Sequence, residues 1–535
     1  MAASTKDRVL LNRQSARRLL TKTLGNMRKK RKLEIDGNRL TLEDFEDVVF
    51  NGTPVSLSAG ARRNMIASRK IVDRIAASDT PAYGINTGFG KLADRHIGHS
   101  QIKTLQINLI RSHACGVGPP LSEAETRGMM LCRANALAKG FSGVRPEVVT
   151  FLLALLNRRI HPIIPSQGSV GASGDLAPLA HLALVLIGEG KIWNGGKPIS
   201  GKAALNKAGL KPFIPGAKEG LALLNGTQAM LSIGSLCLLE AETLLDTADV
   251  ASALSLEALK GTPRAFDKRL QETRPYPGQL KTAEHLRKLL AGSQIRTSHL
   301  DCSRVQDAYS LRCIPQVHGA IRDTLDLARR TFSIELNAAT DNPLVFAREG
   351  DLISGGNFHG QPLALIMDYM AIALTELSSI SERRIERLIT PEYGDLPPFL
   401  TRDPGLNSGF MMLQVTAAAL TSACKVLAHP ASVDSIPTSG NREDHVSMGM
   451  GAALKLKQVL ANLRKILAIE LLCASQGIDF LHPLQPGIGG KKAYRLVRSV
   501  SPMLQEDRSL APDIEMLEER IEKKQFAAIL NGLRE

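Results

Sequence analysis

The chain has 535 residues, of which 44% are hydrophobic and only 4% aromatic, and its formal net charge is +15. A chain of this length can bury a large core. Because that core must be built from Leu, Ala, Ile and Val with few aromatic residues, the composition favours helices over sheets. We therefore predict an all-α fold.

The first 33 residues carry most of the excess charge. They contain eleven Lys or Arg and one acid, Asp7, so the rest of the chain carries only +5. The run Arg28-Lys29-Lys30-Arg31-Lys32 is compatible with a nuclear address, a nucleic-acid patch or a transit-like segment. Charge runs mostly repel and stay solvated, so we interpret residues 1–33 as a flexible basic extension and expect no nucleic-acid partner. A silent scaffold that binds nucleic acid through this extension is a remote alternative.

The seven cysteines are scattered along the chain, and none has a Cys-x-x-Cys spacing. This pattern predicts reduced thiols in a cytoplasmic protein, with neither a disulfide framework nor a metal site. No apolar stretch long enough for a secretory signal follows the first basic residues.

Among the shorter helices expected in the first third, loops lie near residues 81–90 and 116–120. The first loop reads Tyr83-Gly84-Ile85-Asn86-Thr87-Gly88-Phe89-Gly90, which places a tyrosine at the head of a Gly-rich segment. The glycine spacing matches neither the Walker A motif nor the dinucleotide fingerprint. A tyrosine in such a loop is most often a packed side chain, so Tyr83 alone does not indicate a function.

The most informative segment is residues 168–181, in which four of the fourteen positions are Gly or Pro and Ala172-Ser173-Gly174 lies at the centre. A glycine amide can be pressed close to a carbonyl two residues before it. Attack of the Gly174 nitrogen on the Ala172 carbonyl, with loss of water there and from the Ser173 hydroxyl, gives a 4-methylidene-imidazol-5-one (MIO) ring, a strong electrophile. The bare tripeptide is usually a turn. A serine-hydrolase elbow fits poorly, because Asp175 stands where that motif needs Gly.

Two uncharged runs, residues 220–239 and 405–424, reach the length of a membrane span but contain polar residues, and we interpret both as buried, with no membrane partner. The first continues as a long helix through residue 246. Further long helical patterns are predicted at 317–340, 362–388 and 446–476, and a surface helix at 514–521. We divide the chain into the extension 1–33, a loop-bearing part 34–220, a long-helix bundle 221–500 and a C-terminal helical segment 501–535.

An electrophile such as MIO can take up the amine of an α-amino acid and let it leave as an adduct. Removing ammonia in this way also requires a base for the proton on the β-carbon and a clamp for the carboxylate. Arg312, in the segment 306–316, can hold a carboxylate through two parallel hydrogen bonds, although a lone Arg is more often in a surface ion pair. Asn225 lies at the start of an uncharged helix, where an amide can also satisfy helix-end groups. A tyrosine such as Tyr83 can act as a base near neutral pH only if the pKa of its phenol falls from about 10.

Several of these motifs, in the same order, resemble the aromatic amino-acid ammonia-lyase and aminomutase family over residues 35–530. The resemblance implies an elongated helical bundle with long central helices, a homotetramer whose active sites draw on three subunits, and no external cofactor. It also implies site roles for Ala172, Ser173 and Gly174 as the MIO precursor, Tyr83 as the base, Tyr309 near the prosthetic group, Gln306 and Arg312 on the substrate, Asn225 beside the electrophile and Phe358 as an aromatic wall.

Two further segments bear on the substrate by resemblance. His113 after Ser112, and Glu443 in Glu443-Asp444-His445-Val446-Ser447, are similar to the histidine-specific branch. A carboxylate can accept a charge-assisted hydrogen bond from an imidazole. We therefore expect conversion of L-histidine to trans-urocanate and ammonia, the first step of histidine degradation. Arg442 and Gln361 depart from that branch, and Arg111-Ser112-His113 also occurs in some aminomutases, so a tyrosine or phenylalanine lyase or 2,3-aminomutase is the alternative.

Overall fold

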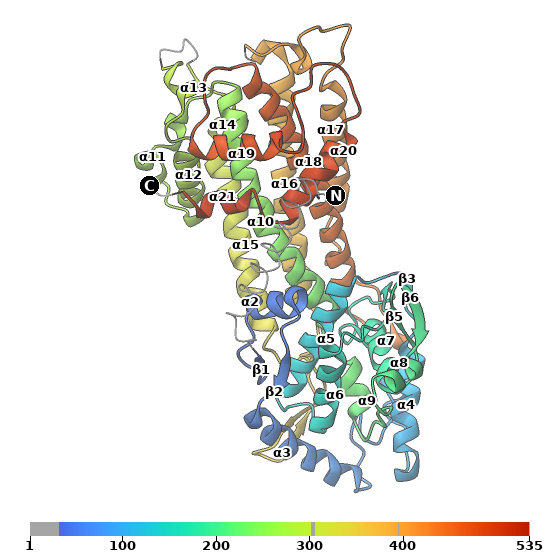
Figure 1. Cartoon of the computed structure of the whole chain (residues 1–535). Helices are drawn as coiled ribbons and strands as arrows, with labels where there is room; N and C mark the ends of the chain where they lie inside the picture. Colours follow the sequence, from blue (N-terminus) through green and yellow to red (C-terminus); the bar gives the residue numbers. More distant parts are fainter. Residues whose placement is uncertain (1–31, 301–304, 394, 534–535) are drawn as a thin grey trace, which may run out of the picture.

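The computed structural model describes residues 32–300, 305–393 and 395–533. The basic extension predicted at 1–33 lies outside the described residues except for its last two positions, and so does Cys302. Long helices form an upper bundle, and shorter helices with small sheets form a lower body (Figure 1). The predicted all-α class is confirmed.

The lower body is built from short helices and small sheets. The helices are α2 (Leu42–Glu46), α3 (Ala59–Ala76), α4 (Ile102–His113), α5 (Glu123–Ala138), α6 (Pro146–Asn157), α7 (Leu176–Leu186), α8 (Gly201–Lys207) and α9 (Glu219–Leu224). Strand β1 (Leu33–Ile35) pairs in parallel with β2 (Val55–Leu57), and the antiparallel pairs are β3 (Val117–Pro120) with β4 (Pro165–Gln167), β5 (Lys191–Asn194) with β6 (Lys197–Ser200), and β7 (Leu344–Phe346) with β8 (Asp351–Ile353). The side chain of Ser122 accepts a hydrogen bond from the Glu125 N–H, and the Glu125 side chain bonds back to the Ser122 backbone, which fixes the start of α5.

Four long helices form the centre of the upper bundle: α10 (Gln228–Ala258), α15 (Ile314–Glu335), α16 (Gln361–Ile389) and α18 (Gly449–Asp479). Helix α18 packs along both α10 and α16. The surrounding helices are α11 (Lys268–Glu272), α12 (Pro277–Leu289), α13 (Gln294–Thr297), α14 (Tyr309–Arg312), α17 (Met411–Leu427), α19 (Ile488–Arg498), α20 (Ala511–Glu522) and α21 (Ala527–Asn531). The long helices predicted at 317–340, 362–388 and 446–476 are therefore confirmed, with shifts of at most five residues at their ends. The helix predicted from 220 to 246 is interrupted: α9 ends at Leu224, and α10 starts at Gln228 and continues to Ala258.

Two helices, α10 and α16, are long and apolar enough to cross a membrane by length and composition. In each, most of the apolar window is buried inside the protein, 78% in α10 and 72% in α16. Both are central to the bundle (Figure 1). The prediction that the run 220–239 is buried is confirmed.

The prediction that residues 405–424 are buried is wrong for the single chain. Helix α17 buries one residue per turn, Leu413, Ala417, Thr421 and Cys424. Met412 and Val426 are 62% and 76% exposed. Only one face of α17 packs, against α16 and α18, and an uncharged composition cannot tell whether a helix has neighbours on one side or on all sides.

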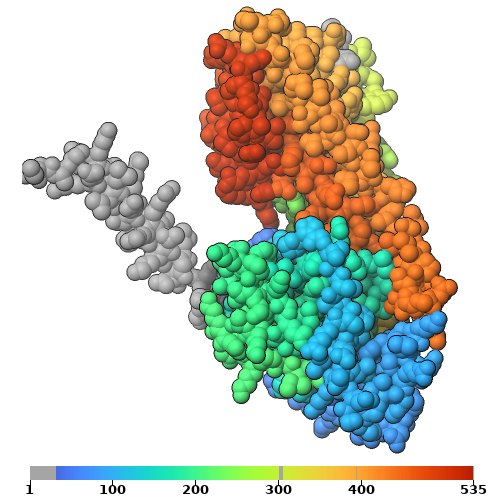
Figure 2. Space-filling view, turned by 90° about the vertical axis from the view of Figure 1, so that its right-hand side faces the viewer, coloured from blue at the N-terminus to red at the C-terminus, as the bar shows by residue number. Residues whose placement is uncertain are grey.

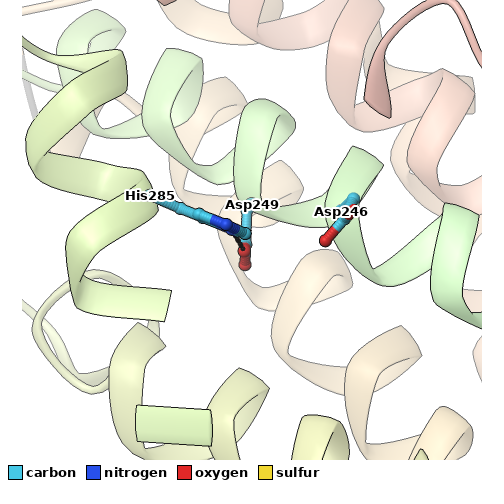
Figure 3. Close-up of side chains that lie close together, drawn as sticks. All are labelled: Asp246, Asp249 and His285. Carbon is cyan, nitrogen blue, oxygen red and sulfur yellow. Dashed lines mark hydrogen bonds and ion pairs between the residues drawn. The ribbon is translucent and has the colours of Figure 1, made fainter. Parts of the chain in front are cut away.

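A cluster of charged groups joins α10, α12 and α15. Figure 3 shows its members Asp246 and Asp249 on α10 and His285 on α12. Asp249 accepts hydrogen bonds from Nδ1 of His285 and Nδ1 of His318, each at 2.8 Å. Asp246, Asp249 and His285 have the spacing of a metal site. The guanidinium of Arg322, however, bonds both Asp246 at 3.0 Å and Asp249 at 2.9 Å, so a cation is already present between the carboxylates. The cluster is an ionic cross-link between three helices.

Candidate active site

The segment Ala172-Ser173-Gly174 lies between β4 and α7 in an unusual backbone conformation. Ser173 and Gly174 have positive φ values, +50° and +78°, and a positive φ is uncommon for a serine. A Cβ on Gly174 would lie 2.2 Å from the carbonyl oxygen of Gly226, so only glycine fits there. The Asp175 N–H donates to that same carbonyl at 2.7 Å. The chain is thus pressed tightly against residue 226, as the composition of 168–181 predicts.

Ser173 opens into a cavity of about 340 Å³. Its lining brings together six residues that the sequence singled out as site residues: Tyr83, His113, Ser173, Asn225, Phe358 and Glu443. These residues come from segments up to 360 residues apart in the sequence. The fold brings them together because α4, α7 and α9 pack against one another, and the segments that precede α16 and α18 supply the rest of the lining. Arg442, one of the two departures noted above, also lines the cavity.

Tyr83 is half-buried at one edge of the cavity. Its ring lies edge-on to that of Phe89, with centroids 6.1 Å apart. Burial raises the pKa of the phenol, the nearby carboxylates of Glu443 and Asp341 raise it further, and a hydrogen bond from the Gly90 backbone lowers it only in part. A base that acts near neutral pH requires a lowered pKa, and among the described residues of the single chain no cation lowers the pKa of Tyr83.

A tight turn at residues 438–443 presents Glu443 to the cavity. Backbone hydrogen bonds between Thr438 and Glu443 close the turn. The hydroxyl of Thr438 donates to Oε2 of Glu443 at 2.7 Å, and the hydroxyl of Ser173 donates to Oε1 at 3.3 Å. The short helix η7 (Ser439–Asn441) of this turn contacts η2 (Gly90–Leu92) in the Tyr83 loop. The two segments lie side by side where orange meets blue in Figure 2.

His113, the last residue of α4, is held in one tautomer. Its Nδ1 lies 2.9 Å from the carbonyl oxygen of Leu109. A carbonyl can only accept, so Nδ1 carries the proton and Nε2 is an acceptor, which no described residue bonds. Burial lowers the pKa of the imidazole, which keeps it neutral. The ring can therefore accept a hydrogen bond in the cavity.

Asn225 lies at the junction of α9 and α10, where it caps the end of α9, and not inside a helix as the sequence predicted. Its Nδ2 donates to Oδ1 of Asp341 and to the carbonyl of Asn342, both at 3.1 Å. Its own Oδ1 is buried and has no hydrogen-bond partner among the described residues. Asn225 lines the cavity, and its side chain holds one acceptor that no described residue uses.

The three remaining predicted residues, Gln306, Tyr309 and Arg312, do not reach this cavity in the single chain. Gln306 lines a small cavity with Arg387, near the far end of α16, whereas Phe358 lies just before the start of α16. With a rise of 1.5 Å per residue, the two ends of α16 are about 40 Å apart. Tyr309 is 70% exposed, and the Arg312 guanidinium lies over its ring at 4.6 Å.

The sequence model of the aromatic amino acid lyase family matches residues 40–499. The chain belongs to this family. Two relatives are the histidine ammonia-lyases of Koribacter versatilis and Myxococcus xanthus, each 54% identical to this chain; the alignments cover 93% of this chain and 99% and 98% of those proteins.

Solved structures of this lyase family superimpose on the chain over nearly its whole length. The histidine ammonia-lyase from Trypanosoma cruzi is 42% identical, with a TM-score of 0.87 over 94% of this chain and 95% of that one. The tyrosine aminomutase from Streptomyces globisporus is 39% identical, with a TM-score of 0.89 over 94% and 99%. The bundle and lower body are thus the architecture of this family.

Members of this lyase family use an MIO group, and residues 172–174 fit one made from their own backbone. The positive φ values of Ser173 and Gly174 and the backbone contact that leaves no room for a side chain at Gly174 form a tight turn, and Asn225, with its unused oxygen, lines the same cavity as Ser173. We call this arrangement the cradle. Gly171 belongs to the same cradle, since a Cβ there would lie 2.1 Å from the hydroxyl of Ser447.

Sequence reasoning missed the residues behind the cavity wall, above all Arg133, Lys218 and Asp341. All three are almost completely buried. The available signal was weak: Lys218 and Glu219 are charges placed directly before an uncharged run, and such charges are rarely buried unless paired. Nothing in the sequence indicates that Lys218 meets a carboxylate 123 positions later.

Proposed function

We propose that this protein is a histidine ammonia-lyase, which converts L-histidine to trans-urocanate and ammonia. The observation that carries the proposal is the cavity itself. Tyr83, His113, Ser173 and Glu443 converge on one space in a chain that is 54% identical to histidine ammonia-lyases over nearly its full length. A cytoplasmic location belongs to the proposal, and the six described cysteines, all free thiols, agree with it.

The prosthetic group is part of this proposal. An MIO ring made from Ala172-Ser173-Gly174 would supply an electrophile that turns the amine into a better leaving group. The chain's own contribution is the close contact of the Gly174 backbone with Gly226, and this compression would favour attack of the Gly174 nitrogen on the Ala172 carbonyl.

Two side chains fit an imidazole substrate. Nε2 of His113 accepts a hydrogen bond, and the carboxylate of Glu443, already held by Thr438, accepts a charge-assisted one. Phe358 contributes an apolar ring to the lining of the cavity. These groups orient the substrate so that the proton on its β-carbon faces a base.

Tyr83 is the proposed base, and it needs a neighbouring cation, because burial raises the pKa of its phenol in the single chain. We propose that Arg312 of another copy supplies that cation and also clamps the substrate carboxylate, in a homotetramer. The exposed apolar side chains of α17, including Met412 and Val426, fit burial between copies.

The test is the appearance of urocanate absorbance in the near ultraviolet when purified protein is given L-histidine. L-tyrosine and L-phenylalanine are run beside it, and the Ser173→Ala variant is the control for the electrophile. Urocanate that forms only with Ser173 present is the expected result. A cinnamate-type or β-amino product from tyrosine or phenylalanine, with none from histidine, would replace this function with the alternative and make Arg442 the residue to explain.

A further inference from the structure

The junction between α9 and α10, residues 224–228, separates the cavity from a group of buried charges. The guanidinium of Arg133, which is fully buried, donates to the carbonyl of Asn225 at 3.0 Å and to Oε1 of Gln228 at 2.7 Å, and also to the carbonyl of Ala222. Burial lowers the pKa of Arg133 to about 10, so it still carries its charge at neutral pH. Burying a charge costs free energy, and here the buried charge of Arg133 is hydrogen-bonded to the backbone carbonyl of Asn225.

A buried ion pair lies near Arg133. Nζ of Lys218 bonds Oδ2 of Asp341 at 2.8 Å, and the side chains are 0% and 2% exposed. Burial raises the pKa of Asp341, but Lys218 and Arg133 outweigh burial and lower it, so Asp341 is ionised. Replacing a buried ion pair by apolar residues often leaves stability unchanged or improves it. A contribution to stability alone therefore does not explain why Lys218 and Asp341 form a buried ion pair here.

The pair determines which way the Asn225 carboxamide faces. Both N–H bonds of Nδ2 are used, one on Oδ1 of Asp341 and one on the carbonyl of Asn342. The opposite orientation would set the amide oxygen against an ionised carboxylate. The oxygen of Asn225 is therefore fixed on the side away from Asp341, where it is buried and no described residue bonds it, and Asn225 itself lines the cavity.

We propose that Asp341 and Lys218 are positioning residues, which hold the Asn225 oxygen ready to accept an N–H bond from the α-amino group of the substrate. The inference rests on the proposed function, because it requires an α-amino acid in the cavity. A carbonyl oxygen attracts the amine and repels the carboxylate on the same carbon, so this fixed acceptor decides which of the two groups lies beside Ser173.

The experiment is a double-mutant cycle. Asp341→Asn, and the double variant Lys218→Met/Asp341→Asn, which leaves no unpaired buried charge, are each made in the wild-type and in the Asn225→Ala background. In the wild-type background we expect kcat/KM for L-histidine to fall on the order of 10- to 100-fold. In the Asn225→Ala background the further fall should be less than about 2-fold, because the group to be positioned is absent.

Binding gives a readout that does not depend on turnover. Calorimetric titration of L-histidine into the Ser173→Ala protein should show weaker binding when Asp341→Asn is added. Glu335→Gln is the matched control: Glu335 is a buried carboxyl that bonds Thr227 at the same junction without touching Asn225. It should leave kcat/KM within about 2-fold of the wild type even where it lowers the melting temperature.

An equal fall of kcat/KM in both backgrounds would mean that the ion pair is only structural, and no fall in the wild-type background would mean that Asn225 needs no positioning. Either result overturns the inference. Failure of the wild-type protein to act on L-histidine overturns the proposed substrate instead. In that case the same cycle with L-tyrosine or L-phenylalanine tests the positioning role, because the amine is common to all three.

Discussion

Glu443 owes its orientation in the cavity to Thr438. The Thr438 hydroxyl donates to Oε2 at 2.7 Å, which leaves Oε1 toward Ser173. Thr438→Val keeps the shape of the side chain and removes the donor. A hydrogen bond to a charged group is worth about 1.5–3 kcal/mol, so we expect kcat/KM for L-histidine to fall roughly 10-fold or more, measured by steady-state formation of urocanate.

Thr438→Ser is the matched control, since it retains the hydroxyl and should stay close to wild-type activity. Glu443→Gln should lower turnover at least as far as Thr438→Val, because it removes the charge that Thr438 orients. Wild-type kinetics in the Thr438→Val protein would show that the backbone hydrogen bonds of the turn suffice to hold Glu443.

At the residue scale, the sequence identified side chains that face the cavity and missed those behind it. His113, Ser173 and Glu443 stand in motifs whose order along the chain matches a known family. Lys218 and Asp341 meet only in the fold, and their pairing has no local pattern. The direction of the Tyr83 pKa also depends on burial and on surrounding charges, which no stretch of sequence near the loop specifies.

At the scale of elements, the ionic cross-link of α10, α12 and α15 makes stability depend on pH. His318 donates from Nδ1 to Asp249, and Nη1 of Arg384 lies 3.5 Å from its Nε2. Burial lowers the pKa of His318 below its ordinary 6.5, and the Arg384 charge lowers it further, against Asp249. The unfolded chain thus binds more protons than the folded one just below pH 6.5. Stability must fall as the pH drops through that window, by at most about 1.4 kcal/mol per pH unit.

Melting temperatures at pH 7, 6 and 5 check this prediction, with His318→Gln as the control. The variant removes the titrating ring, so its melting temperature should fall less steeply between pH 7 and 5 even if it is lower at pH 7. Asp249, whose pKa is lowered by its partners, adds a second loss only below its ordinary value of 3.8. Parallel curves for the two proteins would exclude His318 as the source.

The long helices were predictable because few structures besides a helix sustain apolar periodicity of this kind over many turns. The pattern at 362–388 became α16, Gln361–Ile389. The pattern at 446–476 became α18, which starts three residues later because Met448 is in the left-handed conformation. The burial of α17 was misjudged because apolar residues buried within a chain and apolar residues on an exposed helix face have the same composition.

At the scale of the whole molecule, one chain holds an incomplete set of site residues at each of two ends. The cavity with Ser173 lies in the lower body, and α14 with Arg312 lies in the upper bundle (Figure 1). The length of α16 sets the separation at about 40 Å, too far for any loop movement to close. If both ends serve one reaction, they must come from different copies.

Complementation tests this arrangement. Ser173→Ala and Arg312→Ala should each be nearly inactive when expressed alone, the first without an electrophile and the second without a carboxylate clamp. Co-expressed in equal amounts and mixed at random, they should form sites in which Ser173 and Arg312 come from different copies, so that about one quarter of the sites contain both intact residues. We expect urocanate formation at about a quarter of the wild-type rate in the mixture. Co-expression of Ser173→Ala with Tyr83→Phe is the control, because both residues lie in one chain's cavity and no mixing unites them. Activity no higher than that control would show that each copy completes its own site.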